Sequence, residues 1–464
     1  MIAADAIVPG LVEFLPRQRW YGGGDAPAVV EVVRREVIRD DWPAMVGLVV
    51  EADGALYQVV VGLRPIDDHA ELFRGHDEAI VGEVQTDHGP AVAYEATADP
   101  ELGLAILDHV TAGRESAERV RPVGVEQSNT SLVYDDRLIL KLFRRLQPGP
   151  NPEVEVTEAL AAIGFEHVAA PVASTAYEQT HLAVVQPYLL GGTEGWAMAL
   201  TSLRDLFGVH DTQPLPVIDP TMPPPVADPA EAGGDFSGEA ERLGVVTAEL
   251  HLALAEAFGK QRGDAASWAE SIGAQAAALA PGDLDPTTPR MVLQALRDVA
   301  DAGSSIRVHG DYHLGQVMRT DAGWFVLDFE GEPIRPVTER RRPTSPLRDV
   351  AGMLRSFHYA SMSGLADRSE VEVAEAWESR NRSAFLDGYL TEASKGDILP
   401  SDETSIDAVL SAFELEKAVY ELGYEMAHRP NWIGIPRAAL RRLTQKRHGG
   451  DDPTDEPLTK RTAQ

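Results

Sequence analysis

The sequence predicts an α+β protein whose first part is rich in strands and whose second part is mainly helical. Strand-like apolar runs dominate the first 190 residues, and amphipathic runs of helical length follow from about residue 237. Between them, residues 209–236 hold seven prolines and few large apolar side chains. A chain of 464 residues exceeds the size of one ordinary hydrophobic core, so we expect two or three cores.

Composition narrows the classes of function. The formal net charge is −32, which argues against a nucleic-acid or membrane-surface partner, because phosphates would be repelled. The chain has no cysteine, which excludes disulfides, thiolate nucleophiles and cysteine-ligated zinc. Neither a secretory leader nor an apolar stretch of about 20 residues is visible, so we expect a cytoplasmic protein.

The order of elements follows from turn and capping signals. Residues 1–89 are expected to form a small α/β unit, in which Asp53 and Gly54 form a hairpin turn between two β-rich runs. Residues 90–190 continue with strands and one helix, which begins with Asn151 as its N-cap and Pro152 in its first position. Residues 191–442 are expected to be helical, with a loop at 209–236, and residues 443–464 form a flexible tail.

The segment RVHGDYHLGQVM, residues 307–318, carries the chemistry. His309, Asp311 and His313 alternate and suggest a metal-binding cluster, but no further histidine has a suitable spacing. The other interpretation is a catalytic loop, followed by a hairpin that ends at Asp328. Asp311, an amide at Gln316 and Asp328 match the order in which kinases place a base and two magnesium ligands. We therefore predict that Asp311 is the base and that Gln316 and Asp328 bind Mg²⁺.

Two further residues are expected to support this loop. His309 is predicted to brace it through hydrogen bonds, and Asp349 is predicted to anchor it. Other catalytic signatures are missing, since the chain contains no G-x-x-x-x-G-K-[ST], no G-x-S-x-G and no H-E-x-x-H.

Residues farther upstream predict a nucleotide site. Lys141 lies within the apolar run LILKLF, where a lone lysine is costly without a partner. Glu153 and Glu155 both qualify as that partner, and Glu153 is preferred. A polar loop at residues 127–131 replaces a glycine-rich loop and can present donors to phosphates. The predicted nucleotide-binding residues are Gln127, Ser128, Asn129, Thr130, Ser131, Lys141, Glu153 and, at a hinge, Gln186 and Tyr188.

At these residues the chain resembles the aminoglycoside-phosphotransferase branch of the protein-kinase-like fold, whose hallmark is H-G-D-x-H-x-x-N followed by D-[FWY]-[ED]. Gln316 departs from the usual Asn, and in this the chain resembles the maltokinases and related sugar kinases. The segments FLPRQRWYGGG (14–24), 328–360 and EKAVYELGYEMAHRPNWIGIP (416–436) are also similar to maltokinase signatures. The resemblance spans nearly the whole chain, apart from the proline-rich stretch and the tail.

The resemblance implies a bilobal protein-kinase-like fold. Residues 1–89 would be an additional N-terminal α/β cap domain, residues 90–190 a β-rich N-lobe and residues 191–442 a helical C-lobe. The implied reaction transfers the γ-phosphate of ATP, with Mg²⁺, to the anomeric hydroxyl of maltose, and maltose 1-phosphate feeds α-glucan (glycogen) synthesis. Trehalose synthase is the implied partner. Arg17, Arg19 and Trp20 are expected to pack the cap against a lobe.

The C-terminal signature predicts the sugar site. Lys417, Tyr420, Glu421 and Tyr424 recur at helical spacing and share one face. Aromatic rings stack on the C–H faces of a sugar, and charged groups bond its hydroxyls. The other interpretation is a solvated helix with two tyrosines in the core. The predicted substrate-binding residues are His313, Lys417, Tyr420, Glu421, Tyr424, Glu425, Asn431 and Trp432.

Two other functions stay open. A kinase of another small hydroxyl acceptor, such as glucosamine or an aminoglycoside, would use the same catalytic residues. A cationic acceptor calls for several carboxylates converging on the pocket, and Lys417 favours a neutral sugar instead. The other class is a catalytically inactive scaffold in a glucan-synthesis complex. Against this interpretation, every expected catalytic position is filled.

Overall fold

The fold is described from a computed structural model, which divides into two compact units. The first unit comprises residues 1–161 and 169–190, and the second comprises residues 162–168 and 191–464. The structure describes residues 6–22, 24–68, 77–123, 129–212, 229–230, 234–279, 286–332, 336–365 and 371–447. Within these ranges, none of the helices combines the length and the apolarity that crossing a lipid bilayer requires.

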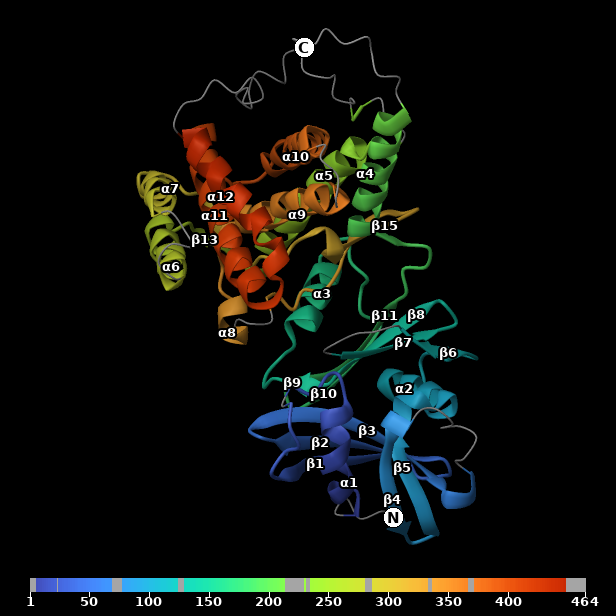
Figure 1. Ribbon diagram of the computed structural model, residues 1–464. Helices are drawn as coiled ribbons and strands as arrows, with labels where there is room; N and C mark the ends of the chain where they lie inside the picture. Colours follow the sequence, from blue (N-terminus) through green and yellow to red (C-terminus); the bar gives the residue numbers. More distant parts are fainter. Residues whose placement is uncertain are drawn as a thin grey trace. The chain divides into compact units, whose positions relative to one another are not determined.

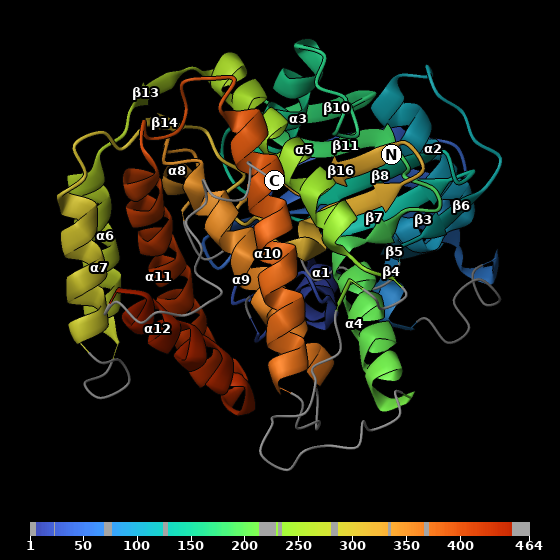
Figure 2. The ribbon, with the colours of Figure 1, turned by 90° about the horizontal axis from the view of Figure 1, so that it is seen from above.

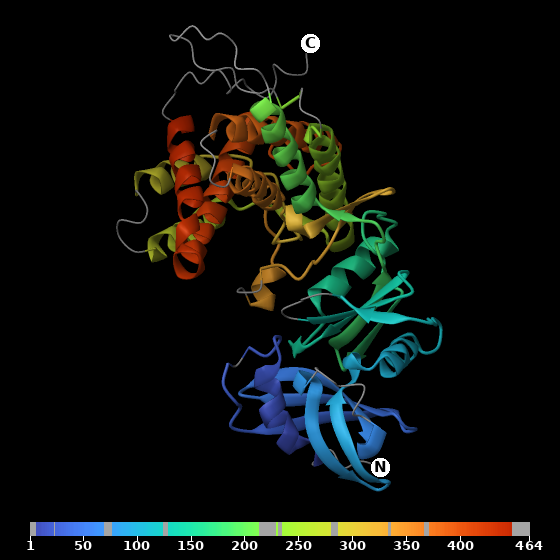
Figure 3. The same ribbon diagram turned by 45° about the vertical axis from the view of Figure 1, so that its right-hand side comes forward.

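The first unit begins with an antiparallel sheet. Its strand order is β1-β2-β3-β5-β4, and helix α1 (Val8–Phe14) contacts β1 and β4 (Figure 3). Asp53 and Gly54 have φ angles of 50° and 76°, as a two-residue hairpin turn requires. Strand β5 is an inner strand here, so this sheet extends past the boundary expected between residues 89 and 90. The strands are β1 (Val30–Arg39), β2 (Ala44–Ala52), β3 (Ala55–Pro65), β4 (Ile80–Thr86) and β5 (Gly89–Glu95).

A second antiparallel sheet follows in the same unit, with the order β10-β11-β8-β7-β6. Helix α3 (Pro152–Ala162) begins as predicted, because Asn151 Oδ1 accepts a hydrogen bond from the Glu153 N–H at 2.8 Å. Helix α2 (Pro100–Thr111) contacts β10 and β11 of this sheet. The strands are β6 (Val120–Pro122), β7 (Asn129–Tyr134), β8 (Leu138–Phe143), β10 (Ala173–Tyr177) and β11 (Thr180–Pro187).

The two sheets of the first unit share one hydrophobic core. Met45 and Val60 of the first sheet belong to the same buried cluster as Ile106 of α2 and Leu140 and Val185 of the second sheet. Short strand β9 (Arg145–Leu146), which follows β8, pairs with β3 of the first sheet. The chain therefore passes directly from the second sheet into the first between β8 and β9, and side chains of both sheets pack together.

The second unit is mainly helical, as the sequence predicts (Figure 1). Helices α6 and α7 lie side by side, and both contact α11 (Figure 2). A small sheet, β12-β15-β16, consists of β12 (Thr193–Glu194) and the predicted hairpin of β15 (Val317–Thr320) and β16 (Gly323–Val326). The helices are α4 (Gly195–Thr212), α5 (Ser237–Phe258), α6 (Ala265–Ala278), α7 (Thr287–Arg297), α8 (Val337–Arg340), α9 (Leu347–Leu365), α10 (Val371–Ala393), α11 (Glu403–His428) and α12 (Gly434–Arg447).

Two expected irregular segments are partly helical. Helix α4 extends to Thr212, so the first residues of the 209–236 loop are helical, and residues 213–228 and 231–233 lie outside the described residues. Helix α12 extends to Arg447, so the tail expected from residue 443 begins later. Residues 448–464 lie outside the described residues.

Candidate active site

The predicted catalytic loop lies between β14 (Ser304–Ile306) and β15, and a carboxylate of α9 anchors it. Asp349 Oδ2 accepts a hydrogen bond from the His309 N–H at 2.7 Å, and Asp349 Oδ1 accepts one from the Gly310 N–H at 2.9 Å. Gly310 has φ +87°, which favours glycine. A Cβ at Gly352 of α9 would lie 2.5 Å from the Tyr312 carbonyl oxygen, so glycine permits the close approach of α9. These contacts confirm that Asp349 anchors the loop.

His309 braces the loop through hydrogen bonds, as predicted. Its side chain is buried, and its Nε2 lies 2.8 Å from the Leu327 carbonyl oxygen. Its Nδ1 accepts a hydrogen bond from the Asp311 N–H at 3.3 Å, which assigns the proton to Nε2. The imidazole thus links Asp311 to the chain segment that carries Asp328.

A second buried histidine supports the anchor and was missed in the sequence. His251 of α5 is fully buried, with Nε2 3.2 Å from Asp349 Oδ2 and Nδ1 2.9 Å from the Tyr389 hydroxyl. Burial alone would raise the pKa of Asp349, but the hydrogen bond to His251, the charges of His251 and His309, and the Gly310 N–H hold that pKa below its ordinary value. A lone histidine in an apolar helix gives no sequence signal for this role.

The two predicted magnesium ligands lie side by side. Gln316 ends a short 3₁₀ turn, and its Nε2 donates to Asp328 Oδ2 at 3.3 Å. Asp328 has φ +58°, a left-handed conformation in which aspartate is one of the few side chains that occur. An amide oxygen and a carboxylate oxygen are ligands that Mg²⁺ prefers, so the donor set fits this ion once the amide is turned over.

Lys417, which was predicted to bind the sugar, contacts the predicted base. Its Nζ lies 3.1 Å from Asp311 Oδ1 and 3.1 Å from Glu332 Oε1. Burial alone would lower the pKa of Lys417, but these two carboxylates raise it above its ordinary value. Arg348 extends these contacts into an array of ion pairs, with its Nη2 3.4 Å from Glu332 and its Nε 2.8 Å from Glu416. Glu332, Arg348 and Glu416 had not been predicted as site residues, because their positions in the sequence do not show that they meet Lys417 or one another.

A small cavity adjoins this array and the catalytic loop. It is bounded on one side by residues of α9 and α11 and on the other by the loop itself. The lining residues are Gly310, Tyr312, Glu332, Arg348, Asp349, Gly352, Phe413, Glu416, Lys417 and Tyr420.

Farther along α11 lies an aromatic ladder on the predicted face. The Tyr420 and Tyr424 rings stack with centroids 6.5 Å apart, and Tyr424 stacks on His428 at 4.5 Å. Trp432 stacks on Tyr359 of α9 with centroids 6.4 Å apart. Tyr424 is 38% exposed, so this part of the face is open to solvent.

The acids of the same face are already paired. Glu421 Oε2 accepts hydrogen bonds from Arg355 Nε at 3.0 Å and Nη2 at 2.7 Å. Glu425 is buried and accepts hydrogen bonds from the Tyr359 hydroxyl and from Arg429. Each of these carboxylates therefore has a cation or a hydroxyl beside it.

Two further predicted sugar-binding residues, His313 and Asn431, lie outside α11. His313 Nδ1 accepts a hydrogen bond from the Gly315 N–H at 3.0 Å, and burial lowers the pKa of the imidazole. His313 thus caps the turn that carries Gln316. Asn431 is exposed in a short 3₁₀ turn after α11.

The phosphate-binding candidates lie in the first unit. Lys141 points from β8 to α3, where its Nζ lies 2.5 Å from Glu153 Oε2, the preferred partner. Asn129, Thr130 and Ser131 are not in a loop, because they are the first residues of β7 and pair with β8. Gln127 and Ser128 lie outside the described residues.

The expected hinge residues are engaged with their own sheet. Gln186 is the penultimate residue of β11, and its Nε2 donates to the Ala169 carbonyl oxygen at 3.1 Å. The Tyr188 N–H donates to the Arg137 carbonyl oxygen at 2.9 Å, and the Arg121 guanidinium lies 5.5 Å from the Tyr188 ring centroid.

Comparison with protein families gives two matches. Residues 14–99 match the maltokinase N-terminal cap domain, and residues 229–368 match the phosphotransferase enzyme family. A glucosamine kinase of Streptacidiphilus jiangxiensis is 27% identical over 423 residues, which cover 87% of this chain and 89% of that protein. A glucosamine kinase of Mycolicibacterium smegmatis (strain ATCC 700084 / mc(2)155) is 28% identical over 343 residues, which cover 70% and 80% respectively.

Solved structures show the same fold. A glucosamine kinase in complex with glucosamine, ADP and inorganic phosphate superposes with a TM-score of 0.63 at 21% identity. The superposition covers 94% of this chain and 99% of that chain. Another crystal form of a glucosamine kinase gives a TM-score of 0.64 at 21% identity, covering 96% and 99%. At these identities the likeness establishes the fold.

Proposed function

We propose that the chain is an ATP-dependent kinase that phosphorylates a hydroxyl group of a small sugar. It is a phosphotransferase of the kinase-like fold, and it has a maltokinase-type cap domain. The observation that carries the proposal is the arrangement around Asp311. A braced loop presents its carboxylate beside a cavity, and Lys417 lies 3.1 Å away. Gln316 and Asp328 lie together on the chain segment linked to that loop by His309.

In this proposal Asp311 accepts the proton of the attacking sugar hydroxyl. Lys417 and the bracing contacts hold the carboxylate in one orientation, and a positioned base contributes about 10²–10⁴-fold to the rate. Most of the remaining acceleration in phosphoryl transfer comes from positioning and from neutralising charge on the phosphates.

Gln316 and Asp328 are assigned to Mg²⁺, which when bound neutralises phosphate charge. In the first unit, Lys141 is assigned to the phosphates of ATP. Its short ion pair with Glu153 fixes the direction of the ammonium group and offsets the cost of its partial burial.

Glucosamine is the first candidate acceptor, in place of maltose. The relatives named glucosamine kinase support it, and each aligns with most of this chain. The ammonium group of glucosamine needs a carboxylate, and Glu332 and Glu416 both line the cavity beside Asp311.

Maltose is the second candidate, and two observations favour it. Residues 14–99 match the maltokinase cap domain. Glu332 and Glu416 already contact Arg348, and Glu421 contacts Arg355, so the charges of this region are largely balanced without a cationic ligand. A balanced site suits an uncharged sugar.

An acceptor panel tests the proposal. Purified enzyme with Mg·ATP is offered glucosamine, glucose, N-acetylglucosamine and maltose, and ³¹P NMR identifies the phosphorylated position. Turnover of glucosamine with little turnover of glucose would support the amino sugar, whereas a signal from phosphate on the anomeric carbon of maltose would favour the second candidate. If no sugar is phosphorylated, and if no sugar raises the rate of ADP release above the rate of ATP hydrolysis without sugar, the proposal is wrong.

A further inference from the structure

We infer that Arg144 ties the cap to the nucleotide-binding strands and acts as a positioning residue for nucleotide binding. The inference rests on the proposed function, which assigns Lys141 to the phosphates of ATP. It concerns a buried arginine that no sequence motif marks.

Arg144 directly follows β8 and is only 1% exposed to solvent. On one side, its Nε donates to Thr130 Oγ1 of β7 at 2.8 Å. On the other side, its Nη2 and Nη1 donate to the two carboxylate oxygens of Glu95 at 2.8 and 3.3 Å. Glu95 is the last residue of β5 in the cap sheet, so one guanidinium joins the ends of strands from both sheets.

The cap surrounds the same guanidinium with further contacts. The Arg144 carbonyl oxygen accepts from the Gln58 N–H at 2.8 Å, and Arg144 Nη1 lies 3.4 Å from the Gln58 carbonyl oxygen. Its carbon Cζ lies 5.2 Å from the ring centroid of Trp20, which packs on Tyr57 at 6.1 Å. This contact gives a role to the segment RQRWYGGG, for which the sequence predicted only packing of the cap against a lobe.

The joined strands carry the phosphate-binding candidates. Lys141 lies three residues before Arg144, and Ser131 is paired opposite Lys141 in the β7–β8 ladder. An arginine fork fixes orientation better than a point charge because its donors are coplanar and bidentate. The guanidinium therefore sets the position of β7 and of the end of β8 relative to the cap strands β3 and β5.

The experiment measures nucleotide affinity, since a purely structural role would change stability alone. Arg144→Lys keeps a charge beside Glu95, so the protein can fold, but the fork is lost. We expect the Kd for Mg·ATP, measured by calorimetry, to rise about tenfold, as for the loss of one hydrogen bond to a charged group. The KM for the sugar is expected to stay unchanged.

Arg17→Lys is the matched control. Arg17 also crosses the cap, but it donates to the carbonyl oxygens of Glu13, Asp77 and Ile80, which all lie in the cap. This variant is expected to lower Tm without changing the Kd for Mg·ATP. An equal rise of Kd in both variants would contradict the inference.

Thr130→Val separates positioning from direct contact with the nucleotide. If Thr130 acts through Arg144, the effects of Thr130→Val and Arg144→Lys on Kd are not additive in the double variant. Additive effects would overturn the inference. Hydrogen exchange gives a second readout. Relative to the wild type, Arg144→Lys is expected to exchange its amide hydrogens faster in β7, with a smaller change in β10. If the wild-type protein itself fails to bind Mg·ATP, the proposed function fails instead.

Discussion

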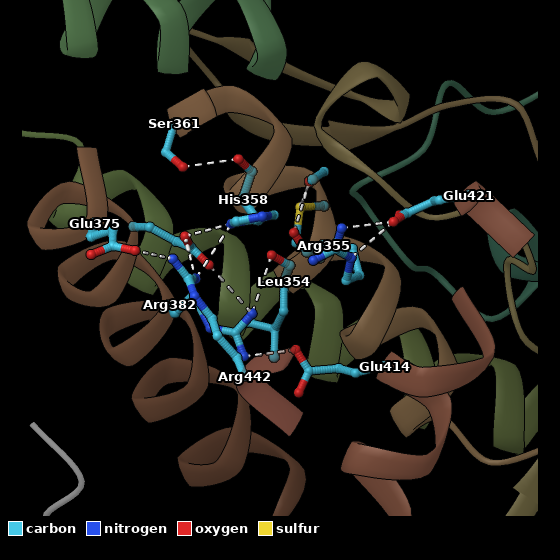
Figure 4. A network of polar contacts seen from close by, with 12 residues as sticks. Leu354, Arg355, His358, Ser361, Glu375, Arg382, Glu414, Glu421 and Arg442 are labelled. Atoms are coloured by element: carbon cyan, nitrogen blue, oxygen red, sulfur yellow. Dashed lines mark hydrogen bonds and ion pairs between the residues drawn. The ribbon is translucent and has the colours of Figure 1, made fainter. Parts of the chain in front are cut away.

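Two arrays of ion pairs in the second unit use the same types of side chain in different surroundings. The first array surrounds the proposed base and is called the catalytic array; it consists of Asp311, Lys417, Glu332, Arg348 and Glu416. The helix-packing array lies on α9, α10, α11 and α12 (Figure 4). Its members are His358, Glu375, Glu378, Arg382, Glu414 and Arg442.

Their surroundings distinguish the two arrays. The last four members of the catalytic array line the cavity beside the loop, whereas the six members of the helix-packing array lie outside that lining. Glu378 accepts hydrogen bonds from His358 at 2.7 Å and from Arg442 at 2.8 Å, which fastens α12 to α9 and α10. Burial and pairing therefore do not identify a functional group by themselves. We expect changes in the first array to lower the rate and changes in the second to lower stability.

The largest effect is expected for Asp311→Asn in the catalytic array. The amide cannot accept the proton, so kcat should fall by about 10²–10⁴-fold. Lys417 keeps its contact with Glu332, so Tm and the Kd for Mg·ATP should stay close to those of the wild type. Steady-state kinetics and calorimetry measure both quantities. Wild-type kcat in this variant would remove Asp311 from the mechanism.

Glu378→Gln in the helix-packing array should lower stability and leave kcat nearly unchanged. Removing one partner of a buried charge cluster costs about 3–5 kcal/mol in the free energy of unfolding. Burial alone would raise the pKa of Glu378, but His358, Arg382 and Arg442 hold it well below its ordinary value. A lowered pKa stabilises the fold above the unfolded-state value of about 4.3, and this contribution is lost as the pH falls.

Urea unfolding as a function of pH measures this difference. The wild type and Glu378→Gln should differ most near neutral pH and converge as the solution becomes more acidic than about pH 4. A difference that stays constant across this range would show that the carboxylate charge is not what fastens α12.

A smaller effect is expected for Lys417→Arg. The charge beside Asp311 remains, but the planar fork cannot occupy the position of one Nζ between two carboxylates. Displacing the base from its productive position should lower kcat by about ten- to a hundredfold. The Kd for Mg·ATP should not change. Full activity would mean that the contact supplies charge alone and no positioning.

The smallest effect is expected for Arg382→Lys. Arg382 donates to Glu414 at 2.7 Å and to the Leu354 carbonyl oxygen at 3.3 Å, and lysine cannot make both bonds from the same geometry. The loss of one such bond costs about 1 kcal/mol in the free energy of unfolding. Thermal unfolding measures it, with kcat as the control. A clear loss of kcat in Arg382→Lys would contradict the assignment of Arg382 to helix packing alone.

Where the predicted residues lie close in sequence, the sequence predicted which of them the structure brings together. Asp311, Gln316 and Asp328 lie on one loop and hairpin, so their order alone implies proximity, and the structure brings Gln316 and Asp328 within hydrogen-bond distance. Lys141 and Glu153 come from neighbouring elements, and the structure pairs them. The polar segment at 129–131 was misjudged because its pairing with β8 depends on a ladder that polarity does not reveal.

Long-range contacts explain what the sequence left out. The spacing of Lys417 on α11 indicates which residues share its face, but not that the face meets Asp311, 106 positions earlier. Glu332, His251 and Arg144 act through partners far away in the chain, and no spacing within the sequence points to those partners. A pattern within one element cannot specify its neighbours in space.

The core shared by the two sheets of the first unit has a consequence for evolution and for engineering. The family match for the cap ends at residue 99, but the compact unit continues to residue 190. Met45 and Val60 pack with Leu140 and Val185, so a cut at residue 99 would expose apolar surface on both fragments. The cap and the strands that carry Lys141 should therefore melt in one cooperative transition. Chimaeras between relatives should exchange the chain up to residue 190, including its partners in the shared core, rather than the cap alone.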